Sequence, residues 1–421
     1  MNLEHSTVRR LVLALLLATT TLAAQEPAVP ASHPRVKAAL ERIRADNAWT
    51  LDQQQSICEI PAPPFKETAR GAEYKRRLEA LGYRNVRVDA VGNVIAERPG
   101  SGAGPTVVLS AHLDTVFPEG TDVSVKREGT TMRGPGIGDD CRGLAVLLAV
   151  ARALNQENVQ TRGTVYLVGT VGEEGLGNSR GTRHLYEKEL AGKIDYFISV
   201  DGTGLGITSR AVGSRRYRVT YQGPGGHSYG AFGMPNPIHA LGRAIARAGD
   251  LQVPSHPRTT FNVGVVQGGT SVNSIAMSGS MDVDLRSESA DALARLDAQL
   301  QRSLAVALAD ENARWPESST RLTMKIDTLG VRPAGAQPDS ARIVRAALSS
   351  LRALGVTPEP TGASSTDANV PIGLGLAGIT IDGGGRGRGA HSLEESYDDG
   401  DRGWIGPQWA ALLAATLAGV R

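Results

Sequence analysis

The sequence has few cysteines, few aromatic residues and almost no net charge. Its 421 residues include two cysteines, 4% Phe, Trp and Tyr, and a formal net charge of +2. The aromatic residues are too sparse for a platform on which nucleic-acid bases stack, and the arginines are scattered rather than gathered in a stripe that follows phosphates. We therefore expect no nucleic-acid partner.

The two cysteines lie in different surroundings. Cys141 stands inside the glycine-rich acidic motif GPGIGDDCRG, and Cys58 stands in the apolar segment SICEIPAP. A disulfide between them would require an oxidising compartment, and the spacing gives it no support. We expect two free, largely buried thiols, with a disulfide as the alternative.

Beyond the N-terminus, no apolar run is long enough to cross a membrane. Arg9 and Arg10 precede the apolar run LVLALLLA, and small residues follow up to Ala24. This pattern predicts a secretory signal peptide at residues 1–24. We therefore expect an exported protein, periplasmic or secreted, that has no membrane partner after cleavage. The Sec route is expected, and the paired arginines leave a twin-arginine signal as the alternative.

The chain is longer than the ~250 to 300 residues at which one core usually stops growing, so we expect more than one domain. Strands alternate with helices up to residue 206 and again from about residue 329, which predicts an α/β sheet, mostly parallel, with helices on both faces. Strands of alternating polarity between these parts predict a smaller inserted α+β domain. We expect a catalytic domain at 25–211 and 328–421, and an inserted domain at 212–327.

A buried strand at residues 164–171 (TVYLVGTV) leads to Glu173 and Glu174. Neighbouring carboxylates repel each other and hold water tightly, so such a pair rarely follows a core strand without a cation or a reaction to use it. The alternative is a solvated start of a loop. The case for chemistry depends on whether other strands end in the same way.

Other strands do. His112 and Asp114 follow the apolar run TVVLSA, Asp201 follows another strand, His391 follows the last strand and a glycine loop, and Asp139 precedes a helix. Ligands of open α/β sheets bind at the carboxyl ends of the strands. Imidazole and carboxylate groups suit zinc, and a cluster this acidic suits two metals that share a carboxylate. We expect the Asp114 carboxylate to accept the proton of the second ring nitrogen of His112.

Five segments in order carry a family resemblance: SAHLDTV, GPGIGDDCRG, GTVGEEGLGNSRG, SVDG and GAHSLEE. Together they resemble the metal-site motifs of the M20 family of zinc metallopeptidases and deacylases. The resemblance implies two zinc ions, with Co²⁺ or Mn²⁺ also permitted by the ligands. It also implies a cis peptide bond after the bridging aspartate. The implied roles are one zinc on His112 and Asp201, the other on Glu174 and His391, Asp139 as the bridge, and Glu173 as the general base.

The inserted domain resembles the lid and dimerisation domain of that family. The resemblance implies a homodimer in which His227 polarises the scissile carbonyl, often in the active site of the partner subunit. The resemblance also implies that Asn273 and Arg286 contact the substrate. An arginine can bind a substrate carboxylate through two parallel hydrogen bonds. Gly362 begins a segment similar to the family's loop beside the substrate.

These features predict an exported two-zinc metallohydrolase that cleaves short peptides, as an aminopeptidase or a dipeptidase. Asp201 stands where carboxypeptidase-like or deacylase-like relatives often carry glutamate and aminopeptidase-like relatives carry aspartate, which favours a peptidase. One alternative is an N-acyl amino acid deacylase that uses the same site. Another is a binding protein without catalysis on the same scaffold.

Overall fold

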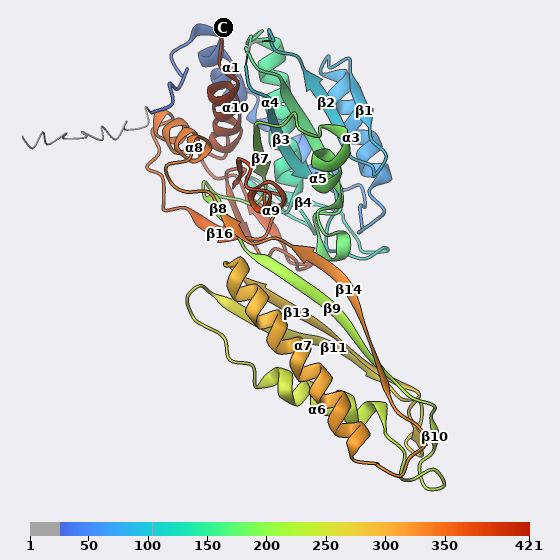
Figure 1. The fold of residues 1–421 in the computed structure, drawn as a ribbon. Helices are drawn as coiled ribbons and strands as arrows, with labels where there is room; N and C mark the ends of the chain where they lie inside the picture. Colours follow the sequence, from blue (N-terminus) through green and yellow to red (C-terminus); the bar gives the residue numbers. More distant parts are fainter. Residues whose placement is uncertain (1–25, 103) are drawn as a thin grey trace, which may run out of the picture.

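The computed structural model describes residues 26–102 and 104–421, which Figure 1 shows as a ribbon. The expected leader, residues 1–24, lies outside the described residues, so the export prediction stays a prediction. Within the described ranges, no helix combines the length and the apolar character needed to cross a membrane.

The larger sheet has four parallel strands at its centre. β6, β3, β7 and β17 lie side by side in this order, each paired in parallel with the next. Antiparallel β1 and β2 extend one edge, and β8 and β15 extend the other, where β16 also joins β8. The predicted α/β class is confirmed. The strands are β1 (Val86–Val88), β2 (Val94–Arg98), β3 (Val107–His112), β6 (Val165–Thr170), β7 (Tyr196–Val200), β8 (Ile207–Ala211), β15 (Gly335–Ala336), β16 (Gly362–Ser364) and β17 (Gly378–Ile381).

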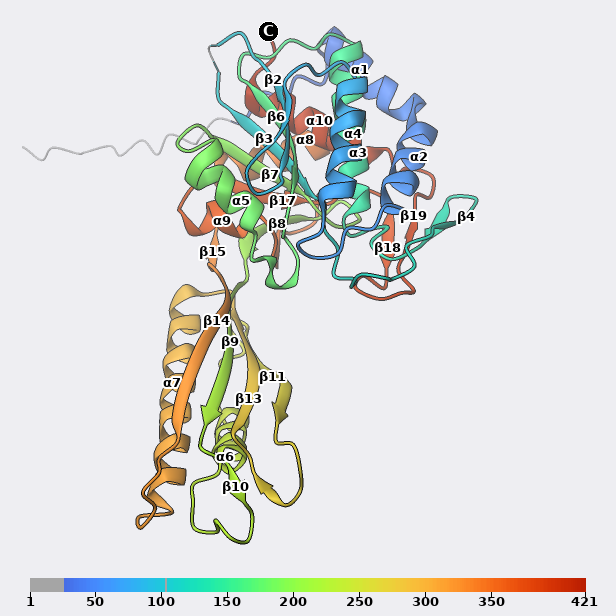
Figure 2. The ribbon, with the colours of Figure 1, turned by 90° about the vertical axis from the view of Figure 1, so that its right-hand side faces the viewer.

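Helices cover both faces of this sheet, as Figure 2 shows. Val107 and Leu109 of β3 belong to the larger hydrophobic core, whereas Val108 belongs to a smaller core on the other face. Burial on both faces explains why these strands are continuous apolar runs in the sequence. The larger layer contains α1 (Pro34–Ala45), α2 (Asn47–Cys58), α3 (Thr68–Ala80), α4 (Cys141–Gln156), α8 (Arg342–Ala353) and α10 (Ile405–Ala418), and the other contains α5 (Arg180–His184), the π-helical turn Leu185–Glu189 and α9 (Asn369–Gly373).

A second sheet projects away from the first (Figure 1). Its antiparallel strands lie in the order β11, β13, β9 and β14, with α6 and α7 packed on one face. Tyr217, Val219 and Tyr221 alternate along β9 and pack in the core beneath these helices. We call residues 213–332 the inserted unit, because the chain leaves the larger sheet after β8 and returns to it at β15. Its elements are β9 (Gly213–Gln222), β10 (Gly226–His227), α6 (Pro237–Gly249), β11 (Thr259–Gly268), β12 (Ser274–Ile275), β13 (Ser278–Ser287), α7 (Ala290–Ala313) and β14 (Thr323–Arg332).

A small antiparallel sheet joins two distant parts of the chain. Its strands lie in the order β18, β19, β5 and β4, and Ser396 of β19 pairs with Arg133 of β5. β5 leads directly into the glycine-rich loop that carries Asp139, and the connection from β18 to β19 carries His391. The pairing therefore holds these two loops side by side. The strands are β4 (Lys126–Glu128), β5 (Thr131–Arg133), β18 (Arg386–Arg388) and β19 (Ser396–Asp398).

The expectation of two free thiols is wrong, because Cys58 and Cys141 form a disulfide. Cys58 is the last residue of α2 and Cys141 the first of α4, and their Cα atoms lie 5.4 Å apart in the buried core. The two cysteines are 83 residues apart in sequence. Only the packing of α2 against α4 brings them together, so their spacing carried no signal.

The disulfide generates a stability prediction. Replacing both Cys58 and Cys141 with alanine should lower the free energy of unfolding by roughly 2 to 4 kcal/mol, because the unfolded chain is no longer constrained by a long closed loop. Urea denaturation of the oxidised wild type and the double variant measures the difference. Wild-type protein reduced under denaturing conditions and then refolded with reductant is the control and should match the variant. Equal stability of all three samples would contradict the disulfide.

Candidate metal centre

Parallel strands of the larger sheet deliver polar side chains to one edge. β3 ends at His112, and Asp201 directly follows β7. Glu173 and Glu174 come shortly after the end of β6. Because the carboxyl ends of parallel strands meet at the same edge of a sheet, these side chains gather where α/β proteins bind their ligands.

The Asp139 carboxylate joins two imidazoles. Its Oδ1 lies 2.9 Å from His112 Nε2, and its Oδ2 lies 3.0 Å from His391 Nε2. His391 Nε2 is also 3.1 Å from Glu174 Oε1. Ligand atoms of His112, Asp139 and Glu174 all lie within 4.8 Å of one another. The structure therefore gathers four of the predicted ligands into one cluster, and the expected cis peptide bond, Asp139-Asp140, is present.

A cavity of about 520 Å³ opens onto this cluster. Asp139, Glu174 and His391 line it, together with Asp201, the fifth predicted ligand, and Glu173, the predicted base. Burial and the neighbouring carboxylates, first Asp139, raise the pKa of Asp201 well above its usual value. Several carboxylates crowded in a buried site repel one another, and a bound cation would relieve that repulsion.

The histidines show that the site favours positive charge. Hydrogen bonds to Asp139 and Glu174 raise the pKa of His391 to about 10. Burial opposes protonation of His112, yet its hydrogen bond to Asp139 and the nearby carboxylates raise its pKa overall. The same anionic field attracts a metal cation in place of the protons, and imidazole nitrogen with carboxylate oxygen is a donor set that suits zinc. The residues thus fit a divalent metal.

Asp114 contacts His112 differently from the prediction. His112 Nδ1 lies 2.9 Å from the backbone carbonyl oxygen of Asp114 but 3.8 Å from its carboxylate, so the predicted bond to the carboxylate is wrong. The carboxylate accepts the backbone N–H groups of Glu173 and Glu174 instead, at 3.1 and 2.8 Å. The extended strand ends at His112, and beyond it residues two apart no longer face the same way. The carbonyl still fixes the tautomer that leaves Nε2 free for a metal.

Arg332 contacts the predicted base, and the sequence patterns did not indicate it. It is the last residue of β14, and its Nη1 donates hydrogen bonds to Glu173 Oε1 at 2.7 Å and to Ser365 Oγ at 3.1 Å. Its Nη2 donates to the backbone carbonyl of Glu173. Burial raises the pKa of Glu173 to about 7, although Arg332 lowers it. The arginine lies 159 residues from the glutamate, so no local motif connects the two.

Glu395 holds the loop that carries Asp139, the predicted bridge between two metals. Its carboxylate accepts backbone N–H groups from Gly136, Gly138 and Asp139 at 2.9, 2.8 and 2.9 Å, and the residue is only 2% exposed. Glu395 follows His391 by four positions, so one carboxylate couples the positions of two ligand loops. It belongs to the motif GAHSLEE, but nothing in that motif indicates which backbone it binds.

The Asp140 carboxylate joins two segments that border the cluster. Its carboxylate accepts the backbone N–H of Gly143 at 2.9 Å, which caps the N-terminus of α4, and the backbone N–H of His112 at 2.9 Å. A short polar side chain before a helix is the usual cap. Asp140 therefore ties the start of α4 to the end of β3.

The structure does not bring His227 and Asn273 to the metal cluster of the same chain. They lie together, since β10 pairs with β12 and Ser228 N donates to the Asn273 backbone carbonyl at 3.0 Å. Figure 1 shows β10 at the tip of the inserted unit, remote from the larger sheet. Arg286, in contrast, lines the cavity beside the metal cluster. Gly362 begins β16, the strand whose last residue, Ser364, also lines that cavity.

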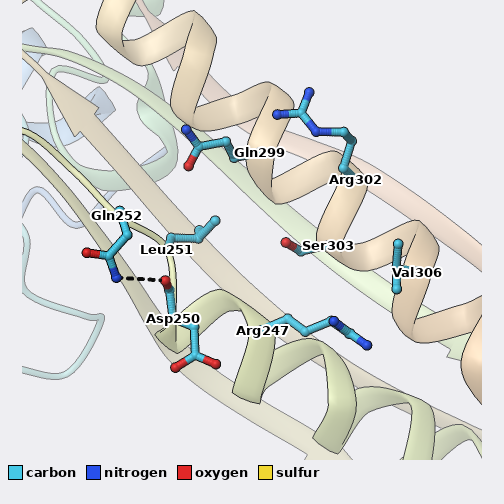
Figure 3. Close-up of a pocket in the computed structure, with 8 residues that line it drawn as sticks. All are labelled: Arg247, Asp250, Leu251, Gln252, Gln299, Arg302, Ser303 and Val306. Carbon is cyan, nitrogen blue, oxygen red and sulfur yellow. Dashed lines mark hydrogen bonds between the residues drawn. The ribbon is translucent and has the colours of Figure 1, made fainter.

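Another cavity, of about 390 Å³, lies between α6 and α7 (Figure 3). Gln252 Nε2 donates a hydrogen bond to the backbone carbonyl of Asp250 beside it, at 3.0 Å. The lining of this cavity contains none of the predicted site residues, so the candidate chemistry belongs to the metal cluster. The lining residues are Arg247, Asp250, Leu251, Gln252, Gln299, Arg302, Ser303 and Val306.

Comparison with known proteins gives a family match. The model of peptidase family M20/M25/M40 matches residues 108–405, which include all five predicted metal ligands. Carboxypeptidase G2 of Pseudomonas sp. (strain RS-16) is 28% identical over 232 residues. That alignment covers 52% of this chain and 54% of the carboxypeptidase, so the chain spans about half the length of this relative.

Solved structures share the fold. Aminopeptidase PepT from Bacillus cereus ATCC 10987 has a TM-score of 0.68 and 19% identity, covering 90% of this chain and 99% of that one. The YXEP protein of Bacillus subtilis, a dinuclear metal-binding peptidase of the M20 family, has a TM-score of 0.64 and 18% identity, covering 90% and 100%. The family match and the cluster of His112, Asp139 and Glu174 together indicate a metal-binding hydrolase.

The position of Glu395 generates a prediction for metal affinity. Glu395→Gln places an amide N–H against backbone N–H donors, which displaces the loop that carries Asp139. Zinc affinity should fall roughly 10- to 100-fold, as for other partners of metal ligands. Competition with a chromogenic chelator measures this affinity. The neighbouring exposed residue provides the matched control, Glu394→Gln, which should bind zinc as the wild type does. Unchanged affinity in Glu395→Gln would contradict the assigned contact.

Proposed function

The chain belongs to peptidase family M20/M25/M40, and from this premise we propose that it uses two divalent metal ions, primarily zinc, to hydrolyse the peptide bonds of short peptides. The observation that carries the proposal is the Asp139 carboxylate, which faces one histidine with each of its oxygens. A carboxylate that presents its two oxygens to separate ligand sets suits a bridge between two metals.

The proposed ligands divide into two sets around that bridge. His112 and Asp201 would hold one ion, and Glu174 and His391 the other, with Asp139 common to both. Zinc bound there would supply a Lewis acid that polarises a carbonyl oxygen and lowers the pKa of water to about 7. Cobalt and manganese accept the same donors, so loading experiments with the three metals distinguish among them.

Glu173 is the proposed general base. It lines the cavity beside the ligand Glu174, and burial raises its pKa to about 7, so it can both accept and return a proton near neutral pH. It would take a proton from the attacking water and then pass it to the nitrogen of the leaving amine. Arg332 holds the carboxylate and the backbone of Glu173 and so fixes its direction.

Arginines on the wall of the cavity support a substrate with a carboxylate. Arg216, Arg286 and Arg332 come from three strands of the inserted unit and all line the cavity. Arg216 and Arg286 share the Asp284 carboxylate, at 3.2 and 2.7 Å from its two oxygens. A guanidinium can bind a carboxylate in bidentate fashion, so the C-terminus of a short peptide would fit here.

A homodimer through the inserted unit would complete the site. β11 is an edge strand of the second sheet and exposes Val265 and Val266, which are 41% and 56% exposed. An unpaired edge with apolar residues is a template for another strand. β10, which contains His227, lies at the tip of the inserted unit, far from the larger sheet (Figure 1), so we propose that His227 serves the cluster of the partner subunit.

Export is part of the proposal. Disulfides form and persist mainly in oxidising compartments such as the periplasm. The Cys58–Cys141 disulfide therefore supports the secretory leader expected from the sequence.

Glu173→Gln tests the proposed reaction. The amide cannot accept a proton from water, so hydrolysis of dipeptides and tripeptides should fall at least ~1,000-fold while metal content stays at the wild-type level. Rates with and without chelator, together with elemental analysis, measure both effects. N-acetyl and N-succinyl amino acids in the same panel test the deacylase alternative. Retained peptide hydrolysis in the variant would refute Glu173 as the base.

Subunit mixing tests the shared site. Glu173→Gln and His227→Ala should each be inactive alone, but one subunit of a mixed dimer would combine an intact Glu173 with a His227 from its partner. After dissociation and reassociation of equal amounts, activity should recover to about a quarter of the wild-type value. Analytical ultracentrifugation confirms the dimer. No recovery in dimers shown to be mixed would contradict the shared site.

A further inference from the structure

Asp382 is a carboxylate in the active-site cavity that the proposed mechanism does not use. It directly follows β17, at the same sheet edge as Asp201 after β7, and lines the same cavity. β7 and β17 are adjacent and parallel, and Asp201 N donates to the carbonyl of Ile381 at 3.1 Å. Asp382 is therefore positioned beside the proposed metal ligands without belonging to their cluster.

The hydrogen bonds of Asp382 are incomplete. Its Oδ2 accepts the backbone N–H of Gly206 at 2.8 Å. Within residues 26–102 and 104–421, no donor bonds to its Oδ1, and no lysine, arginine or histidine forms an ion pair with it. Burial raises the pKa of Asp382 to about 7, and the negative charge of Glu359 acts in the same direction.

A glycine-rich turn surrounds this carboxylate closely. A Cβ atom on Gly204 or Gly206 would lie 2.8 or 2.9 Å from Asp382 Oδ2, and one on Gly202 would lie 3.3 Å from Oδ1. The backbone of this turn therefore packs closely against one side of the Asp382 carboxylate. Thr203, Thr208 and Thr380 also line the cavity and carry hydroxyl groups.

The cavity thus carries charges of opposite sign on different elements. The arginines Arg216, Arg286 and Arg332 come from the inserted unit, whereas Asp382 comes from the larger sheet. The arginines already have acidic partners, Asp284 and Glu173, but Asp382 has no cationic one among the described residues. A ligand that brings its own positive charge would complete the pairing.

We propose that Asp382 binds the free α-ammonium group of the substrate, so that the enzyme acts on unblocked short peptides and not on N-acyl amino acids. This inference rests on the proposed peptidase function and names its substrate class. Asp382 and Asp201 leave neighbouring strands side by side, so the ammonium would lie close to the scissile bond. Cleavage would therefore release the N-terminal residue.

A competing explanation is that Asp382 only holds the turn that contains Gly206. The variant Asp382→Asn distinguishes the two explanations, because asparagine keeps an acceptor oxygen for the Gly206 N–H but lacks the negative charge. The substrates are tri-alanine, its N-acetyl derivative, and an analogue in which a hydroxyl group replaces the α-ammonium. The zinc-loaded full chain is used, with kcat/KM as the readout. Asp401→Asn, an exposed carboxylate outside the cavity, is the matched control.

We expect Asp382→Asn to lower kcat/KM for tri-alanine roughly 10- to 100-fold and to leave the rates for the two substrates without an α-ammonium group unchanged. Wild-type enzyme should prefer tri-alanine to the hydroxyl analogue by a similar factor, a comparison that needs no variant. Asp401→Asn should behave as the wild type does.

Different results would overturn different claims. An equal loss for all three substrates would assign Asp382 to holding the turn. Wild-type enzyme that hydrolyses substrates with and without the α-ammonium group equally well, or prefers the acetylated one, would overturn the inference while the hydrolase function stands. Wild-type enzyme that hydrolyses none of them would overturn the proposed peptidase function together with the inference.

Discussion

The contact on which the site depends is the pairing of one carboxylate with two imidazoles. Asp139 lies 2.9 Å from His112 and 3.0 Å from His391, although 252 residues separate it from the second histidine. The parallel sheet positions His112, and the small antiparallel sheet positions His391. Glu395 then holds the intervening loop through three backbone N–H groups. Distant segments are thus fixed by contacts that leave the side chains of the predicted ligands facing one another.

The sequence predicted the parts of this site that follow local rules. Apolar strands ending in His112, Asp201 and the two glutamates are visible as patterns, because burial on both faces makes a strand apolar until it leaves the core. The α/β class followed from the same alternation. The disulfide and the contact between Arg332 and Glu173 could not be predicted in this way. They join residues 83 and 159 positions apart, and only tertiary packing determines such neighbours.

The cavity unites the two parts of the chain. The part of the chain outside the inserted unit contributes four of the predicted metal ligands, the predicted base and Asp382, and the inserted unit contributes three arginines. Arg332 connects the parts directly, since it ends β14 and contacts Glu173. Any movement of the inserted unit therefore also moves the contact that directs the base. In the proposed dimer, movement of this unit would shift its arginines in the site of its own subunit and its His227 in the site of the partner subunit.

The central claim is that these side chains hold a pair of metal ions bridged by Asp139. Anomalous diffraction from crystals of the full chain grown with zinc, recorded above and below the zinc absorption edge, tests it most directly. The account predicts two anomalous peaks per chain, about 3.5 to 4 Å apart, one on each side of the Asp139 carboxylate. A single peak that does not contact Asp139, or peaks only at surface residues, would contradict it.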